Sequence, residues 1–213
     1  RFTKKLLNKY PAHSVAKSNP ILQRLRSVKG PIELDLLQKA CDITEKGFRR
    51  ILNFVKPNVM EYEIEAEFAH EFLRNRSKGF AYTPIIASGA NACVLHYISN
   101  ELPCQDGDLL LLDVGACYGN YNADMTRTIP VNGKFSARQR QVYLAVQAVL
   151  NYATDIMRPG VYWVDYQKAV EVFMENQLIE LGLFTRQDVE NQDPNNPLFK
   201  KYFMHGVAHH LGL

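Results

Sequence analysis

Two aspartates, Asp113 and Asp124, are the residues whose types and spacing are best suited to chemistry, and they lie in the stretch LLLLDVGACYGNYNADMTRTIP. Leu109 to Val114 is an apolar run of strand length, and residues 121–129 are predicted to form its antiparallel partner. A two-residue turn at Tyr118-Gly119 would place Asp113 directly opposite Asp124, with Cβ atoms about 5 Å apart. Both carboxylates would then share one face of the hairpin.

Two carboxylates that face each other repel, so such a pair needs a proton or a partner charge. Either one carboxyl group is protonated because its pKa is raised, or a cation lies between the two groups and is ligated by them. A purely structural explanation is also open, in which the strand register differs by one residue, so that one aspartate belongs to a surface turn. The spacing leaves these possibilities open.

Histidines close the chain in the stretch His205-Gly206-Val207-Ala208-His209-His210. Two histidines four residues apart occur in zinc peptidase helices, but that motif needs Glu directly after the first His, where Gly206 stands. A thermolysin-like site is therefore excluded. Imidazoles outside a helix remain good ligands for Mn, Fe, Co or Zn, so Asp, Asp and His together fit a transition-metal hydrolase. A lone histidine in an apolar stretch is more often structural, which is the alternative for His210.

His96 is a further candidate. It follows a turn of small residues, Ser88-Gly89-Ala90-Asn91, and ends a predicted strand that begins at Cys93. At that place a polar ring can leave the core and face a cleft. A purely structural ring is the alternative.

The elements that must position these residues follow from hydrophobic periodicity and from helix start and stop signals. The order is helix, helix, strands, helix, helix, polar loop and a final strand-like stretch, which indicates an α+β fold. Helices are expected at 32–55 and 61–75, after Ser136 as far as Pro159, and from a cap at Asp165 to Gly182; strands are expected at 82–87, at 94–98, in the aspartate hairpin and from Phe199, with a polar loop at 185–198.

Composition limits the class of protein. With 213 residues, 46% of them hydrophobic, the chain can bury the core of one domain or slightly more. It has no apolar run of membrane-spanning length and no signal-peptide pattern at the start. The cysteines Cys41, Cys93, Cys104 and Cys117 form no CxxC pair, so we expect free thiols in a reducing cytoplasm, with one buried disulfide as the alternative.

Charge is divided unevenly along the chain. Residues 1–30 hold eight Lys and Arg and no acid, which leaves 17 of the 25 basic residues against all 22 acidic ones in the remainder. A basic tail can bind nucleic acid, but this one has no RNA-binding motif and no interleaved aromatic residues. We therefore expect a solvated linker and no nucleic-acid or membrane partner.

Five motifs in order resemble a known family. They are Ile85-Ile86-Ala87-Ser88-Gly89 with Asn91 and His96, Leu112-Asp113-Val114-Gly115, residues 122–128, residues 130–135, and residues 203–213. Over Arg24 to Leu213 the chain is similar to the catalytic domain of Xaa-Pro aminopeptidases (aminopeptidase P). These are pita-bread metallopeptidases, which also include prolidase, methionine aminopeptidase and creatinase.

The resemblance implies two divalent metal ions, manganese with cobalt, zinc and iron as alternatives, held by two Asp, one His and two Glu. It implies that Asp113, Asp124 and His209 are the aspartate and histidine ligands. It also implies that His96 and His205 contact the substrate and stabilise developing charge. The two glutamates would lie beyond Leu213, so the pita-bread fold is expected to be incomplete at the C-terminus, and the fragment is expected to bind metal weakly and to be inactive by itself.

The implied activity is hydrolytic release of an N-terminal residue that precedes proline, by attack of metal-activated hydroxide on the peptide carbonyl. Prolidase activity on dipeptides and a non-catalytic protein-binding module are the alternatives, with metal-free creatinase-like chemistry as a third. Residues 1–24 are expected to be a basic linker from an absent N-terminal domain, and residues 25–213 a partial catalytic domain. The protein is expected to be cytoplasmic, with homo-oligomerisation possible.

Overall fold

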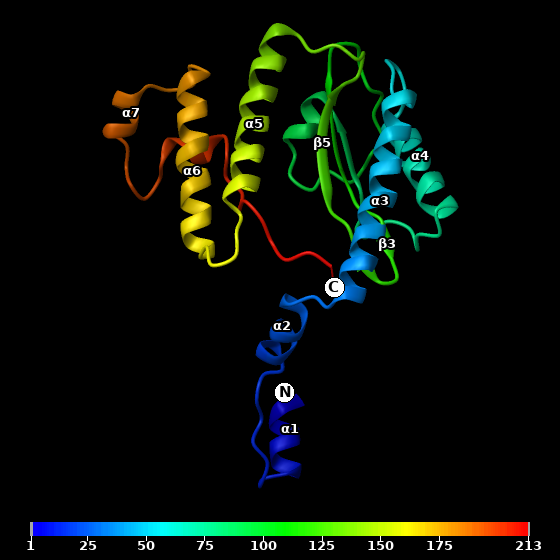
Figure 1. The fold of residues 1–213 in the computed structure, drawn as a ribbon, viewed down its shortest axis with the longest axis vertical. Coiled ribbons are helices and arrows are strands. Elements are labelled where there is room, and N and C mark those ends of the chain that lie inside the picture. The colour runs from blue at the N-terminus through cyan, green and yellow to red at the C-terminus, as the bar shows by residue number, and fades with distance from the viewer. Residues whose placement is uncertain (1, 213) are drawn as a thin grey trace.

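The computed structural model describes residues 2–212 as a mixed α+β fold (Figure 1). The helices are α1 Phe2–Lys9, α2 Asn19–Ser27, α3 Pro31–Phe54, α4 Glu61–Arg74, α5 Ala137–Ile156, α6 Trp163–Glu180 and α7 Arg186–Glu190. The strands are β1 Ile85–Ser88, β2 Leu109–Val114, β3 Cys117–Tyr118, β4 Tyr121–Asn122 and β5 Met125–Pro130, and short 3₁₀ helices cover Gly89–Cys93 and Leu198–Lys201. Arg1 and Leu213, the ends of the predicted segments, lie outside the described residues. The four long helices are thus found where the sequence predicts them.

The central sheet is antiparallel, with the strand order β1-β2-β5. Alternation of side chains divides β2 into two faces. Leu110, Leu112 and Val114 are fully buried against α3 and α4, whereas Asp113 is half-buried on the opposite face. On β1, Ile85 pairs with Asp113 and shares its face. The predicted strand at Leu109 to Val114 is confirmed, and its pleat aims Asp113 away from the core.

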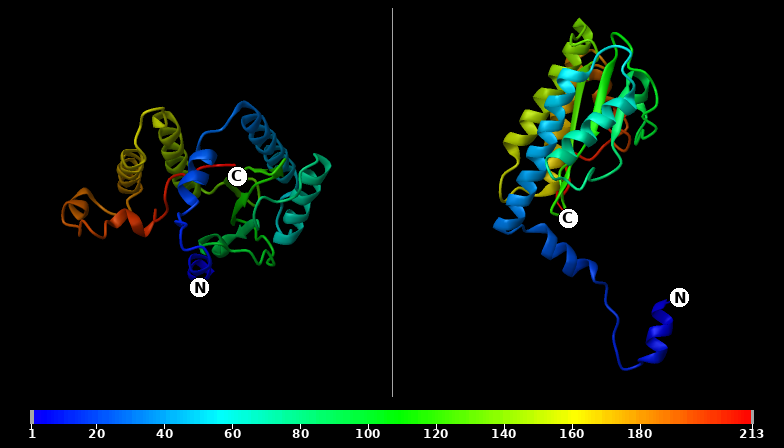
Figure 2. Two further views of the ribbon diagram at one scale, coloured as in Figure 1. Left: turned by 90° about the horizontal axis from the view of Figure 1, so that it is seen from below. Right: turned by 90° about the vertical axis from the view of Figure 1, so that its right-hand side faces the viewer.

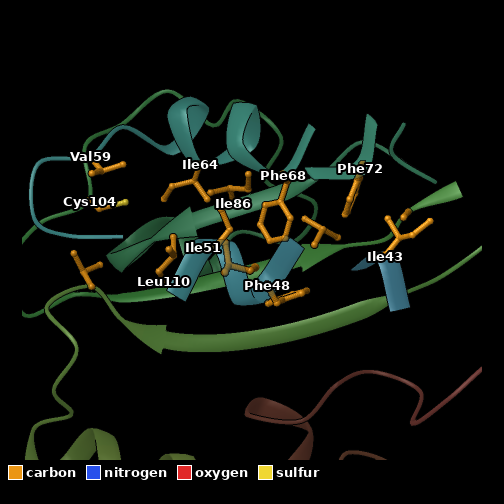
Figure 3. Close-up of a cluster of buried hydrophobic side chains, with 14 residues drawn as sticks. Ile43, Phe48, Ile51, Val59, Ile64, Phe68, Phe72, Ile86, Cys104 and Leu110 are labelled. Carbon is orange, nitrogen blue, oxygen red and sulfur yellow. The ribbon is translucent and has the colours of Figure 1, made fainter. Parts of the chain in front are cut away.

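The main core fills the space between the sheet and the pair α3–α4 (Figure 3). Phe68 and Phe72 on α4 are fully buried, and the Phe68 ring meets Phe48 of α3 edge to face with centroids 5.2 Å apart. Burying a side chain of this size contributes roughly 1.5–3 kcal/mol. The sheet face that carries Asp113 is therefore backed by a closely packed layer.

A second, smaller core joins α5 and α6. The Ser136 hydroxyl accepts a hydrogen bond from Gln139 N at 3.2 Å, which confirms the predicted cap of α5. Tyr152 and Phe173 stack with centroids 4.4 Å apart, and the 3₁₀ turn residue Phe199 is buried against this pair of helices. Phe203, Val207 and Ala208 also pack against this core, and the end of the chain then crosses towards the sheet (Figure 1).

Several predicted boundaries are wrong. Residues 94–98 form no strand, because their backbone bonds locally in turns: Val94 N donates to Asn91 O and Tyr97 N donates to Val94 O. The stretch from Phe199 forms a 3₁₀ turn and an extended segment, and the polar loop 185–198 contains α7. The cap of α6 is Tyr162, so Asp165 lies in the first turn, where an acid still favours the helix dipole.

The hairpin register also differs from the prediction. Gly119 and Asn120 both have positive φ, 58° and 67°, and form the two-residue loop between the paired residues Tyr118 and Tyr121. Glycine and asparagine tolerate this conformation, whereas Tyr118 packs against the core instead of turning. Asp113 therefore pairs with Thr126. Because the slip is two residues, Asp124 is a diagonal neighbour of Asp113 and not its opposite.

The N-terminal helices α1 and α2 extend away from the rest of the molecule (Figure 2), and among residues 2–27 no helical residue is buried. Helix α2 runs across the expected boundary at residue 24. Within residues 2–212 no helix is both long and apolar enough to cross a bilayer.

Candidate metal centre

A cavity of about 440 Å³ opens on the sheet face opposite α3 and α4. Its wall is partly apolar, formed by two isoleucines, and partly polar, formed by a threonine and four side chains that can ionise. The lining residues are Tyr82, Thr83, Ile85, His96, Ile98, Asp113 and Asp124. Three of the predicted site residues therefore meet at one cavity.

The two aspartates are linked by the phenol of Tyr82. Its hydroxyl donates to Asp113 Oδ1 at 2.6 Å and lies 3.1 Å from Asp124 Oδ1. One phenol proton cannot satisfy two carboxylates, so the pair keeps acceptor capacity for a cation or a further proton. Burial, followed by the hydrogen bond to Asp113, raises the pKa of Tyr82 far above its usual range, so the phenol remains a donor.

Backbone pairing positions Tyr82. Gly115 O accepts a hydrogen bond from Ala81 N at 2.8 Å, and Phe80 and Ala116 form an isolated antiparallel bridge. Ala116 N in turn donates to the buried Thr44 hydroxyl of α3 at 2.9 Å. The segment that carries Tyr82 is thus fixed beside the end of β2.

His209 reaches the same place from the far end of the chain. Its Nε2 lies 2.9 Å from Asp124 Oδ2, and its Nδ1 lies 2.9 Å from His210 O. Because both ring nitrogens face acceptors, the doubly protonated ring is favoured. The backbone hydrogen bond to His210 is the main cause that raises the pKa of His209, burial opposes it, and the charge of Asp124 supports it. The segment is tied to the hairpin by Asn122 N, which donates to Gly212 O at 3.2 Å.

We expect the His209 ring to titrate above the ordinary histidine value of about 6.5 in the metal-free protein. The pKa of His209 is higher in the folded protein than in the unfolded chain. The contact therefore stabilises the folded C-terminal segment fully at pH values below the unfolded pKa. That stabilisation is lost as the pH rises through the folded value. An NMR titration of the histidine rings measures this, and a His209 pKa at or below the ordinary value would contradict the ion pair.

Asp124→Asn should lower the His209 pKa in that titration, because the neighbouring negative charge is removed. Asp106→Asn is the matched control. Asp106 is an exposed acid in the turn before β2, at the end of the strand remote from Asp113, where it accepts a hydrogen bond from Asn132.

The remaining histidines are placed differently. His96 lines the cavity from a turn in which its φ is 56°. His205 is exposed, and in the part of the chain that the structure describes it is not among the residues lining the cavity. The ring of His210 stacks on Trp163 with centroids 6.2 Å apart, which agrees with a structural role for that residue.

The donor set fits a divalent metal ion. Within residues 2–212, no three His, Cys, Asp or Glu side chains already form a ligand cluster: the Tyr82 hydroxyl lies between the carboxylates, and the His209 ring contacts Asp124. A ligating histidine usually donates its other ring N–H to a carbonyl or carboxylate, and the Nδ1 of His209 lies beside His210 O in this way. Two carboxylates and such an imidazole are suitable ligands for a transition-metal ion.

Sequence patterns miss two parts of this site. Tyr82 carries no local signal, because a tyrosine before a strand is usually core. Sequence patterns do not reveal the apolar wall formed by Ile85 and Ile98 either, because isoleucines in such segments are usually core residues. Pairing of β1 with β2 places Ile85 beside Asp113, and pairing of Ala81 with Gly115 places Tyr82, so neither could be found before these pairings are known.

Comparison with known proteins gives consistent matches. The model of metallopeptidase family M24 matches residues 35–213. The chain is 38% identical over 194 residues to an Xaa-Pro aminopeptidase of Haemophilus influenzae, covering 91% of this chain and 45% of that protein. Proline aminopeptidase P II from Yersinia pestis superposes with a TM-score of 0.85 at 37% identity, covering 92% of this chain and 44% of that one. A variant of Escherichia coli aminopeptidase P in complex with substrate gives the same TM-score at 35% identity and the same coverage. The chain therefore spans less than half the length of these relatives.

Proposed function

Because the chain belongs to metallopeptidase family M24 and has the mixed α+β pita-bread fold of part of an aminopeptidase P chain, we propose that the full-length protein is a two-metal Xaa-Pro aminopeptidase. It would release an N-terminal residue that precedes proline. The observation that carries the proposal is the meeting of Asp113 and Asp124 at one cavity, where His209 from the far end of the chain contacts Asp124.

Asp113, Asp124 and His209 are the residues of this chain that would hold the metal ions, with manganese proposed first and cobalt, zinc and iron as alternatives. Such ions, when bound, supply Lewis acidity to the scissile carbonyl and lower the pKa of a water molecule. Two ions need more carboxylates than these, so we propose that two glutamates outside residues 1–213 complete the set. The residues here would by themselves hold metal weakly.

The other residues of the cavity would orient the peptide. His96 lies on the wall where its ring can donate to an oxygen that gains charge, and His205 would join it once the site is complete. Ile85 and Ile98 offer apolar contact to a side chain or a ring. Tyr82 keeps its proton and holds the carboxylates at a fixed distance from each other.

We expect the full-length protein, loaded with Mn²⁺, to hydrolyse a tripeptide of the form Xaa-Pro-Xaa and to leave the dipeptide Xaa-Pro largely intact. Liberated N-terminal amino acid measures the rate, and removal of the metal with a chelator should abolish it. Preference for the dipeptide would identify prolidase activity instead. Cleavage of neither peptide by protein with full metal content would contradict a peptidase and favour a binding module.

Further proposals concern organisation and location. Residues 25–213 would be part of the catalytic domain, and residues 1–24 would link it to a preceding domain of the full-length protein. The described cysteines Cys41, Cys93, Cys104 and Cys117 are all free, which supports a reducing cytoplasm.

A further inference from the structure

The loop that follows β1 carries two residues of the cavity wall, His96 and Ile98. Apart from the 3₁₀ turn Gly89–Cys93, residues 89–101 form no regular structure, and both His96 and Asn100 have positive φ, 56° and 48°. Non-glycine residues rarely adopt this conformation, and it persists only where surrounding contacts hold it. The position of His96 therefore depends on what fixes the loop.

Glu61, the first residue of α4, is fully buried and binds this loop at four points. Its Oε1 accepts hydrogen bonds from Ser88 N at 2.8 Å and from Asn91 Nδ2 at 3.1 Å. Its Oε2 accepts hydrogen bonds from the Tyr97 hydroxyl at 2.7 Å and from Leu102 N at 3.1 Å. These donors lie before, within and after the loop, so one carboxyl group fixes both of its ends and the residue next to His96.

Asn100 holds the loop from the other side. It is 2% exposed, accepts a hydrogen bond from Ile86 N at 3.0 Å, and donates to Pro84 O at 3.0 Å. Its amide also donates to Glu65 of α4 at 2.8 Å. Glu61 and Glu65 are one helical turn apart, so the first turns of α4 present two carboxyl groups to the same loop.

We propose that Glu61 is a positioning residue of the active site, which acts through the loop 89–101 to place His96 at the cavity. This rests on the proposed function in so far as His96 is assigned a role towards the substrate. Glu61 itself is not among the residues that line the described cavity, and its contacts with the loop are polar and buried. A displaced loop would move the His96 ring while Asp113 of β2 and Asp124, which precedes β5, stay in place.

Glutamine at position 61 tests the proposal with almost no change in volume. Each carboxyl oxygen accepts one backbone N–H, from Ser88 on one side and from Leu102 on the other, and a backbone N–H cannot reverse its role. A glutamine side chain has a single oxygen, so in either orientation its NH₂ group faces a buried backbone donor. At least one end of the loop is thereby released.

In the full-length, metal-loaded protein, Glu61→Gln should lower kcat/KM for an Xaa-Pro tripeptide roughly 10- to 100-fold, because small misplacement of a catalytic group has effects of that size. Amide hydrogen exchange of residues 89–101 should become faster, while metal content stays that of the wild type. In a His96→Ala background, Glu61→Gln should change kcat/KM by no more than about threefold, since residues that act through each other are not additive.

Glu67→Gln is the matched control. Glu67 lies on the same helix and pairs with Arg50 of α3, so its replacement weakens helix packing without touching the loop. Its kcat/KM and its exchange in residues 89–101 should equal those of the wild type. Tyr97→Phe removes only one of the four hydrogen bonds and should shift both readouts in the same direction as Glu61→Gln, but less.

Unchanged exchange of residues 89–101 in Glu61→Gln would overturn the proposal, and so would a full additive loss in the His96→Ala background. The amide hydrogen exchange of residues 89–101 can be measured whether or not the protein hydrolyses a peptide. A wild-type protein that cleaves no Xaa-Pro peptide would therefore remove the proposed function, while exchange would still decide whether Glu61 holds the loop.

Discussion

Asp124→Asn in the full-length, metal-loaded protein should lower kcat/KM for an Xaa-Pro tripeptide on the order of 1000-fold, since Lewis-acid assistance is worth several kcal/mol and each 1.36 kcal/mol is tenfold. Asp124 contacts both the Tyr82 hydroxyl and the His209 ring. Asparagine keeps the size and one oxygen but loses the negative charge. Steady-state kinetics with metal analysis of the same sample measure the effect.

Asp106→Asn serves as the control here as well, because it removes one exposed carboxylate of the same type at the other end of β2 and should leave turnover unchanged. Wild-type turnover by Asp124→Asn would refute the two-metal proposal. A lost rate with undiminished metal content would instead show that Asp124 acts on the substrate and not on the metal.

Gly115→Ala should destabilise the folded protein by about 3 kcal/mol or more, at or above the upper end of typical overpacking costs. A Cβ atom at Gly115 would lie 1.8 Å from Ala123 O and 3.2 Å from the Tyr82 ring. Its nearest neighbour is backbone, which cannot rotate away, so the strand connection must move. Urea unfolding of the purified protein, monitored by far-UV circular dichroism, gives the change in free energy.

The control for this substitution is Gly206→Ala, because a Cβ atom there meets nothing within 4 Å. It should change the urea midpoint only slightly. Equal midpoints for both variants would contradict the close approach of Gly115 to Ala123. The same approach brings Asp124 next to Asp113, so we also expect Gly115→Ala to reduce metal content.

Much of the scaffold could be predicted because its signals are local. The apolar stripe of residues 32–55 and the Ser136 cap each depend on neighbours within a few positions, and the structure has α3 and α5 there. The strand at Leu109 to Val114 was also recognisable from its apolar run. Similarity to aminopeptidase P supplied the fold family, which periodicity alone does not specify.

The failures have a common physical cause, which is contact between residues distant in sequence. Residues 94–98 have strand-forming side chains, but the Tyr97 hydroxyl binds the distant Glu61 and the backbone forms local turns in place of a strand ladder. The hairpin register depended on which pair of residues adopts positive φ, and packing of Tyr118 on the core decided it. Tyr82 was missed because only backbone pairing with Gly115 places it between the aspartates.

The assignments of Asp113, Asp124, His96, His205 and His209 stay predictions. The geometry supports four of them by bringing Asp113, Asp124 and His96 to one cavity and His209 to Asp124. His205 lies on the exposed C-terminal stretch. The sequence could suggest that the two aspartates are close, because they share a hairpin. It could not show that His209 lies beside them, because that contact requires the intervening chain to fold back.

That return of the chain determines when the centre can form. The carboxylates lie beside the sheet that packs on α3 and α4, whereas His209 follows the separate core of α5 and α6. Domains fold from the N-terminus as the chain is synthesised, so the sheet can be complete while the imidazole is still inside the ribosome. The contact between His209 and Asp124 therefore forms late in synthesis, after the sheet that positions the carboxylates.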